Sequence, residues 1–233
     1  MISKFGVFLF LYMSVLWISP GVAKEAGFVL DHTLKAWDKI TFDNKKPNRF
    51  GNCGAGCIEV ETAASVSMIS KPVSIDLAKY PVFSWEWKID RPVAISDLTI
   101  KGKDDRSVAV YVAFPYDPDK ASFSEKISRT MIEIFQGSDA PGRSISYVWG
   151  GYGNPADVVE SPYYGTVNAM IIGRNQSAPV GDWIIEKMDL VADHKRIYGY
   201  VPTTVSHVSI SADSDDIGGQ RRSFVRNIEF SAK

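Results

Sequence analysis

The chain has few cysteines, few histidines and no excess of basic residues, and each shortage excludes a class of function. Its 233 residues include 2 Cys and 3 His, and 26 Lys and Arg stand against 27 Asp and Glu. Without a basic excess there is little to neutralise phosphate groups, so nucleic acid is a poor partner. The Gly-x-Ser-x-Gly, His-Glu-x-x-His and Gly-Lys-Ser/Thr motifs are also missing, which removes the familiar hydrolase, metalloprotease and nucleotide-binding signatures.

Long hydrophobic runs are scarce as well, and the one at the N-terminus has the form of an export signal. Lys4 precedes an apolar run over 5–18, and Gly21-Val22-Ala23 follows it. The run is shorter than the ~20 residues of a spanning helix, and small residues suit a signal peptidase. We predict a cleaved signal peptide over 1–23, one domain over 24–233 and a periplasmic or secreted protein without a membrane span. The alternative is an uncleaved N-terminal anchor.

The two cysteines lie close together in a glycine-rich loop, Gly51-Asn52-Cys53-Gly54-Ala55-Gly56-Cys57. In an oxidising compartment, Cys53 and Cys57 are expected to form a small structural disulfide. A redox pair would have two residues between the cysteines, and a zinc site would need more ligands. Both are disfavoured.

The stretch 82–91 alternates apolar and polar residues. Phe83, Trp85, Trp87 and Ile89 fall on one side of a period-two pattern, with Ser84, Glu86, Lys88 and Asp90 on the other. This pattern predicts a strand with one buried face. Since each aromatic side chain can bury about 150–250 Å², we expect this strand to be the centre of the core.

Similar patterns recur along the chain, notably over 107–114, where Val108, Val110 and Val112 share a face. A strand over 65–70 is expected to end at Pro72. Two helices are predicted, one from the Ser122/Glu125 capping box with an apolar stripe at Ile127, Met131, Ile134 and Phe135, and one over 190–198 ended by Gly199. Because helices do not alternate with strands, we predict an all-β, antiparallel jelly-roll-like β-sandwich with one or two short helices.

Several of these motifs together resemble one known family. They are Ser84-Trp85-Glu86-Trp87-Lys88-Ile89-Asp90, Asp104-Asp105 before the 108–112 strand, Tyr147-Val148-Trp149, Ser161-Pro162-Tyr163, Trp183 with Glu186, Asp189, Asp193 and Gly199, the 211–218 turn, and Ile228-Glu229-Phe230. The chain resembles the bacterial family catalogued as domain of unknown function 3047, roughly from Trp37 to Phe230. The resemblance implies export and a jelly-roll-like sandwich similar to carbohydrate-binding folds. It implies no established activity or catalytic residue.

Two turns carry carboxylates. Asp213, Asp215 and Asp216 follow a strand, and Asp104 and Asp105 precede one. Carboxylates in a turn suit a hard cation such as calcium, although the spacing is not that of an EF-hand. The alternative is that both are solvated turns, because Asp is a common turn former. If both turns lie at one end of the sandwich, they would form a joint metal site.

Aromatic residues and one glutamate are the candidates for binding sugars. Tyr147, Trp149 and Tyr152 run into a glycine-rich loop, and Tyr163 follows it. Flat rings stack on the apolar face of a pyranose, while the alternative for Tyr147 and Trp149 is the core. Glu86 would belong to a glycosidase pair if a second acid lay about 5–5.5 Å away, for retention, or about 6.5–9.5 Å away, for inversion. Otherwise it is a cross-strand charge pair.

These observations favour non-catalytic binding of a polysaccharide or cell-envelope glycan. One alternative is a carbohydrate-active enzyme, a hydrolase or lyase, that uses Glu86 and the 213–216 turn. The other is a structural envelope protein without a small ligand.

Overall fold

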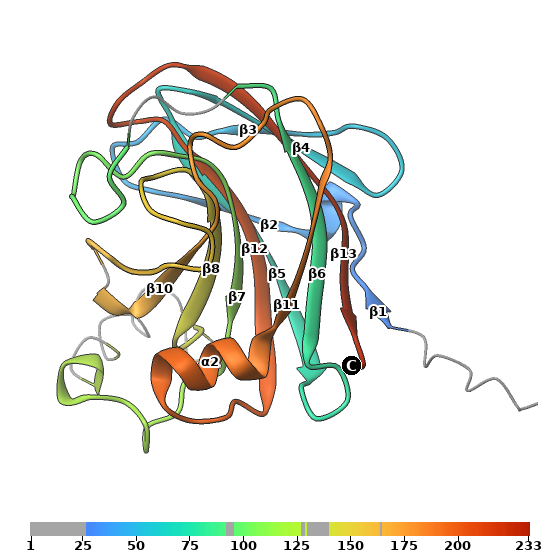
Figure 1. The fold of residues 1–233 in the computed structure, drawn as a ribbon, viewed down its shortest axis with the longest axis vertical. Helices are drawn as coiled ribbons and strands as arrows, with labels where there is room; N and C mark the ends of the chain where they lie inside the picture. The colour runs from blue at the N-terminus through green and yellow to red at the C-terminus, as the bar shows by residue number, and fades with distance from the viewer. Residues whose placement is uncertain (1–26, 92–95, 127–128, 130–139, 164) are drawn as a thin grey trace, which may run out of the picture.

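Two β-sheets pack face to face in the computed structural model of the chain, which describes residues 27–91, 96–126, 129, 140–163 and 165–233 (Figure 1). Sheet A has the order β11-β6-β13-β4-β3, with β1 beside β13. Its strands are β1 (Phe28–Val29), β3 (Arg49–Asn52), β4 (Cys57–Ala63), β6 (Val82–Ile89), β11 (Ile184–Asp189) and β13 (Gln220–Ser231). The predicted signal peptide, 1–23, lies outside the described residues.

Sheet B has the order β2-β5-β12-β7-β8-β10-β9. Its strands are β2 (Asp38–Thr41), β5 (Val66–Asp76), β7 (Arg106–Ala113), β8 (Ser144–Trp149), β9 (Val158–Ser161), β10 (Gly165–Arg174) and β12 (Thr204–Asp213). The strand pairs are antiparallel except that β10 runs parallel to β8. The predicted all-β jelly-roll-like sandwich is therefore confirmed, with one parallel pair that the sequence did not indicate.

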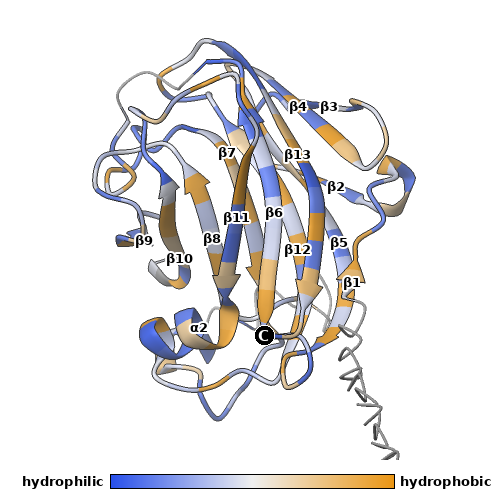
Figure 2. Cartoon of the chain, turned by 45° about the vertical axis from the view of Figure 1, so that its right-hand side comes forward, coloured by the Kyte–Doolittle hydropathy of each residue, from blue (hydrophilic) through white to orange (hydrophobic). Residues whose placement is uncertain are grey.

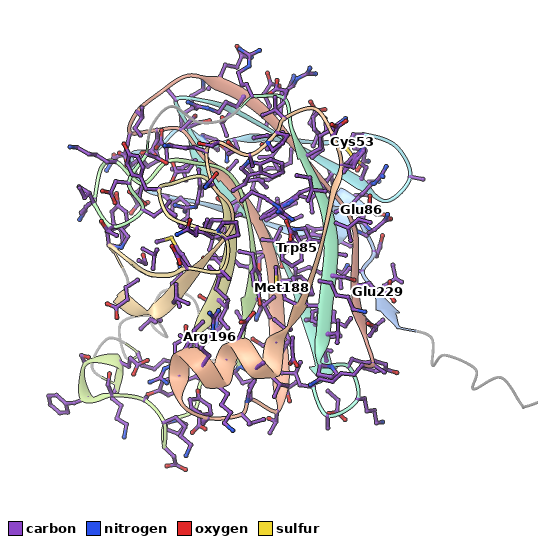
Figure 3. The ribbon with its side chains drawn as sticks, viewed as in Figure 1. Cys53, Trp85, Glu86, Met188, Arg196 and Glu229 are labelled. Carbon is purple, nitrogen blue, oxygen red and sulfur yellow. A yellow bond between two sulfur atoms is a disulfide. The ribbon has the colours of Figure 1, made fainter. Side chains whose placement is uncertain are left out.

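The core forms around β6, as its alternation predicts. Phe83, Trp87 and Ile89 are 0% exposed and Trp85 is 1% exposed. Trp85 lies 4.9 Å from Tyr147 and Trp87 lies 5.5 Å from Trp149, centroid to centroid, so the rings of β6 meet those of β8 between the sheets. Hydrophilic and hydrophobic segments follow one another along β13 in Figure 2, and Figure 3 shows Trp85 and Glu86 on opposite sides of β6.

The helix α2 (Leu190–Tyr198) lies across one end of the sandwich (Figure 1). It begins where the Asp189 side chain accepts a hydrogen bond from the Ala192 N–H and ends at Gly199, whose φ is 80°. A glycine at that φ is the usual end of a helix, so this prediction is confirmed. A 3-10 helix, η1 (Leu34–Ala36), precedes β2.

The capping box at Ser122 is also present, because the N–H of each of Ser122 and Glu125 donates to the side chain of the other. A helical turn over 123–126 follows it. The apolar stripe predicted for Ile127, Met131, Ile134 and Phe135 lies outside the described residues.

A disulfide joins Cys53 to Cys57, as predicted, and closes the turn between β3 and β4. The backbone N–H of Cys53 also donates to the carbonyl of Cys57. Gly54 and Gly56 have φ of 117° and 65°, which explains the glycines of this loop. Among the residues described, no helix is both long and apolar enough to span a membrane.

Candidate functional site

The two aspartate-bearing turns of the sequence lie together at one end of sheet B. β12 and β7 are antiparallel neighbours, and their register places Asp213 opposite Arg106. The turn that follows β12 therefore meets the loop that precedes β7. We call the five carboxylates gathered there the acidic cluster: Asp104, Asp105, Asp213, Asp215 and Asp216.

Asp105 joins the two turns directly. Its side chain is fully buried, and its two carboxylate oxygens accept hydrogen bonds from the backbone N–H groups of Asp216, at 3.2 Å, and Ile217, at 3.0 Å. Burial raises the pKa of Asp105, and these two N–H groups lower it in part. Asp105 thus holds the 213–217 turn by satisfying backbone donors that the turn leaves free.

Arg106 provides the buried counter-charge. Its Nη1 lies 3.4 Å from Asp104 Oδ2 and 3.6 Å from Asp213 Oδ2, and its Nη2 donates to the Tyr111 hydroxyl at 3.0 Å. Burial nevertheless raises the pKa of Asp213 to about 8, although Arg106 opposes this shift. Burial therefore outweighs the single guanidinium, which serves two buried acids, so Asp213 holds its proton far more readily than an ordinary aspartate.

Lys45 covers the cluster from a third segment of the chain. Its Nζ contacts Asp215 Oδ2 and lies 3.8 Å from Asp216 Oδ1. The hydrogen bond with Asp215 raises the pKa of Lys45. Burial opposes ionisation of Asp215, but hydrogen bonds from Asp213 and Lys45 leave its pKa below the ordinary value.

The arrangement of Asp105, Asp215 and Asp216 is suited to holding a cation. Each offers a carboxylate oxygen, and the three atoms lie within 4.8 Å of one another. The donors are all oxygen, which suits a hard cation such as calcium rather than a metal that prefers nitrogen or sulfur.

Tyr163 lies at the rim of the acidic cluster and is 45% exposed. The Lys101 ammonium is 4.9 Å from its ring centroid. Burial raises the pKa of Tyr163, and the charges of Asp104 and Asp216 raise it further, because they disfavour a phenolate beside them. Of the predicted sugar-binding residues, Tyr163 is the one that the structure brings to the predicted metal ligands.

The other predicted aromatic residues lie elsewhere. Tyr147 and Trp149 are 0% exposed and belong to the core, so they form no part of an open surface. The Tyr147 hydroxyl donates to Asp193 Oδ2 on α2 at 2.9 Å. Tyr152 is 54% exposed in the loop after β8, and none of the contacts described for that loop reaches the acidic cluster.

Glu86 lies on the outer face of sheet A and is not joined to the acidic cluster. Its carboxylate accepts hydrogen bonds from Arg226 Nε, at 2.8 Å, and Asn227 Nδ2, at 2.6 Å. Burial raises the pKa of Glu86, but the hydrogen bonds from Asn227 and Arg226 outweigh burial and leave the pKa below its ordinary value. Arg226 is the register partner of Glu86 on β13. Glu86 therefore forms a cross-strand charge pair with Arg226. None of its described contacts reaches the 213–216 turn, as the predicted enzyme would require.

Comparison with known proteins now identifies the family. A family model described as protein of unknown function (DUF3047) matches residues 35–229. The chain belongs to the DUF3047 family. The matched residues include both turns of the acidic cluster and Tyr163.

Other comparisons place the DUF3047 chain near several solved β-sandwiches. A family 11 carbohydrate-binding module of a cellulosomal cellulase of Clostridium thermocellum is 10% identical, with a TM-score of 0.46, and the match covers 89% of this chain and 95% of that one. The native family 12 xyloglucanase from Bacillus licheniformis is 12% identical, with a TM-score of 0.40, and the match covers 89% of this chain and 100% of that one. No curated protein matches the chain significantly. With TM-scores below 0.5, we draw nothing from these likenesses about ligands of the DUF3047 chain.

Sequence reasoning missed Lys45 and Arg106, which supply the cations of the site. Arg106 directly follows the Asp104-Asp105 pair, so its position was a usable signal. Lys45 lies in a polar loop of the DUF3047 chain more than 160 residues before Asp215, and nothing in that loop distinguishes it from Lys46.

Proposed function

We propose that the DUF3047 chain binds an uncharged or cationic glycan without catalysis, at the surface formed by Tyr163 and the outer part of the acidic cluster. The observation that carries this proposal is the position of Tyr163, a partly exposed ring beside carboxylates. A pyranose that stacks on a tyrosine ring presents its hydroxyls to the side, where carboxylate oxygens accept their hydrogen bonds.

The accessible groups at this surface differ in kind, as sugar recognition requires. The side chain of Lys45 is 41% exposed and that of Asp216 is 16% exposed, while Tyr163 offers an apolar ring. Ile217, 36% exposed, lies next to Asp216. The surface thus combines an aromatic platform with a donor and an acceptor that would fix the orientation of the sugar.

The charge of the site indicates which glycans fit it. Lys45 pairs with Asp215 and Asp216, and Arg106 pairs with Asp104 and Asp213, while Asp105 accepts hydrogen bonds from backbone N–H groups, so the carboxylates outnumber these two cations even with Asp213 protonated. Like charge repels a polyanion, so a uronic-acid polymer is disfavoured, whereas neutral or amino sugars are not.

Binding assays on the oxidised, full chain would test this proposal. We expect it to bind a neutral polymer such as hydroxyethylcellulose or an amino polymer such as chitosan oligosaccharide, and not polygalacturonate, in affinity electrophoresis and calorimetry. Tyr163→Ala should lower the affinity about 5- to 150-fold, because loss of a stacked aromatic costs about 1–3 kcal/mol.

The matched control is Tyr152→Ala, which removes another exposed tyrosine from a loop without described contacts to the cluster. It should bind as the unmodified chain does. Equal affinity of Tyr163→Ala and the unmodified chain would refute the proposed surface. Release of reducing sugar from a bound polymer would show catalysis and refute the non-catalytic assignment.

A further inference from the structure

One buried histidine lies among aromatic rings at the end of α2. His194 is 0% exposed, and its ring lies 4.5 Å from Phe114, 4.8 Å from Tyr198 and 4.6 Å from Tyr200, centroid to centroid. Phe114 follows β7, Tyr198 ends α2, and Tyr200 lies between α2 and β12. The imidazole therefore joins the body of the sandwich to residues 199–203, which we call the connecting segment.

The hydrogen bonds of His194 indicate which nitrogen carries the proton. Its Nδ1 lies 2.9 Å from the carbonyl oxygen of Tyr200, and because a carbonyl can only accept, Nδ1 is the protonated nitrogen of the neutral ring. Nε2 is buried and has no hydrogen-bond partner within the described part of the chain. A second proton, on Nε2, would therefore create a buried donor without an acceptor, which is costly.

A neighbouring cation also opposes a second proton. The pKa of His194 is lowered mainly by burial and further by the charge of Arg143, while the hydrogen bond with the Tyr200 carbonyl raises it. The Arg143 guanidinium lies 5.7 Å from the Tyr200 ring centroid and pairs with Glu125 at 2.8 Å. The nearby carboxylate thus already balances Arg143 and leaves no acid to pair with an imidazolium.

The other titratable groups around these rings supply no counter-charge either. They are Asp117, Lys120, Asp193, Tyr198 and Tyr200. Lys120 is a second cation, 5.8 Å from the Tyr200 ring centroid. Asp117 acts on Tyr200, whose pKa is raised mainly by burial, as is that of Tyr198, so both phenols are neutral. On α2, the Asp193 carboxylate accepts a hydrogen bond from Arg196 at 3.0 Å.

The connecting segment is held at both ends and at His194. It begins at Gly199, whose φ is 80° and whose N–H donates to the Lys195 carbonyl. At its other end the Thr203 carbonyl accepts from the Leu77 N–H at 3.0 Å. For the backbone of 200–202, the hydrogen bond that the structure describes is the one between Tyr200 and His194. Loss of that bond would free the middle of the segment while its ends stay fixed.

We propose that His194 is a pH-sensitive switch, in which the neutral ring holds the connecting segment closed and a second proton releases Tyr200 and opens it. In the open state water can accept from Nε2, and the imidazolium is screened from Arg143. Tyr200 also lines a pocket together with Tyr116 and Pro141, so its release widens that pocket. The switch does not depend on glycan binding and can be tested with protons alone.

The sign of the pH dependence follows from the two states. An exposed histidine has a pKa of about 6.5, and the closed state binds its proton more weakly. The open state therefore gains a proton that the closed state lacks as the pH falls below about 6.5, so acid favours opening and pH values above this range favour closure.

NMR titration and hydrogen exchange of the oxidised, full chain would test the switch. The His194 imidazole should titrate below the ordinary value. After correction for intrinsic rates, the amides of the connecting segment should exchange about tenfold or more faster at about pH 5 than at about pH 7, because opening takes up a proton. The amides of β6, in the core, should exchange more slowly than those of the segment at both pH values.

Two variants make the test specific. His194→Gln retains an N–H donor for the Tyr200 carbonyl but cannot take up a proton, so exchange of the connecting segment should lose its pH dependence. His32→Gln is the matched control, because His32 is also buried and its Nε2 accepts from the Ile228 N–H at 3.2 Å. This variant should keep the acid response of the segment. Circular dichroism checks the folding of both variants.

The unmodified chain alone can overturn the proposal. A His194 that titrates at or above the ordinary value would do so, and so would corrected exchange of the connecting segment that is equal at the two pH values. An acid response in His194→Gln equal to that of the unmodified chain would refute His194 as its origin. Exchange of the β6 amides in acid as fast as that of the segment would show unfolding of the whole domain rather than local opening.

Discussion

Replacement of Asp213 by asparagine should remove a dependence of stability on pH. Asp213 is 7% exposed, and burial raises its pKa to about 8 although Arg106 opposes the shift. In the unfolded chain an aspartate has a pKa of about 3.9. Between these values the folded state holds a proton that the unfolded state has lost, so stability falls as the pH rises through this window.

The magnitude follows from the same two values. Between the unfolded and folded pKa values, and far from both, the free energy of unfolding falls by about 1.4 kcal/mol per pH unit. The slope becomes smaller as the pH approaches the folded pKa. From about pH 6 to about pH 8 the unmodified chain should therefore lose about 2 kcal/mol from Asp213 alone. Asp213→Asn cannot ionise and should show none of this loss.

Urea unfolding followed by tryptophan fluorescence, with EDTA present and the disulfide oxidised, would measure the difference. His32 and His194 are buried, with pKa values lowered mainly by burial, and they titrate in both proteins. The difference between the two proteins therefore reports Asp213 together with Asp215, the carboxyl to which its titration is coupled. Asp38→Asn on the exposed face of β2 is the matched control and should follow the unmodified chain. Parallel pH profiles for the unmodified chain and Asp213→Asn would refute the assignment of a buried, protonated Asp213.

Two further predictions concern the sandwich itself. A Cβ at Gly173 would lie 2.8 Å from Trp87 Cζ2, so Gly173→Ala should destabilise the fold by about 1–3 kcal/mol through overpacking. Gly51→Ala is the control, because the nearest atom to a Cβ there is 3.9 Å away. An equal urea midpoint for the two variants would refute the tight contact at Gly173. Replacing both Cys53 and Cys57 with serine should cost about 2 kcal/mol, because a five-residue ring restricts the unfolded chain little; a loss above about 4 kcal/mol would show that the disulfide holds more than its own loop.

Local patterns in the sequence were sufficient for much of the fold. The alternation around Trp85 and Trp87 predicted β6 and its buried face, and Gly199 predicted the end of α2. These features depend on residues that are neighbours along the chain, so strand and helix periodicity describe them well. The glycine-rich loop and its two cysteines were equally local and predicted the disulfide.

One proline lies inside a strand, β5, rather than at its end. Pro72 was expected to end the strand that begins near Ser65, yet β5 continues from Val66 to Asp76. The pairing with β12 is irregular between Val205 and His207, and His207 lies opposite Pro72. Proline is tolerated at such a bulge because no regular ladder bond is demanded of it there.

Alternation also could not decide which face of a strand is buried. Tyr147 and Trp149 were candidates both for the core and for a sugar-binding surface, and they lie on the inner face of β8 opposite Trp85 and Trp87. Two faces of one strand differ only in what packs on them, and that depends on the other sheet. Tyr163 stays exposed because it lies in the turn between β9 and β10, outside both faces.

The acidic cluster shows the same limit in its strongest form. Asp105 and Asp216 are 111 residues apart, and each turn alone is indistinguishable from a solvated one. They meet because β7 and β12 are neighbours with Asp213 opposite Arg106, and strand order is not encoded by the period of either strand. The sequence could therefore state a joint site only as a condition on topology. Once that condition holds, the buried Asp105 secures the two turns together, and the carboxylates are brought so close that burial and like charge raise the pKa of Asp213 while the Lys45 ammonium pairs with Asp215.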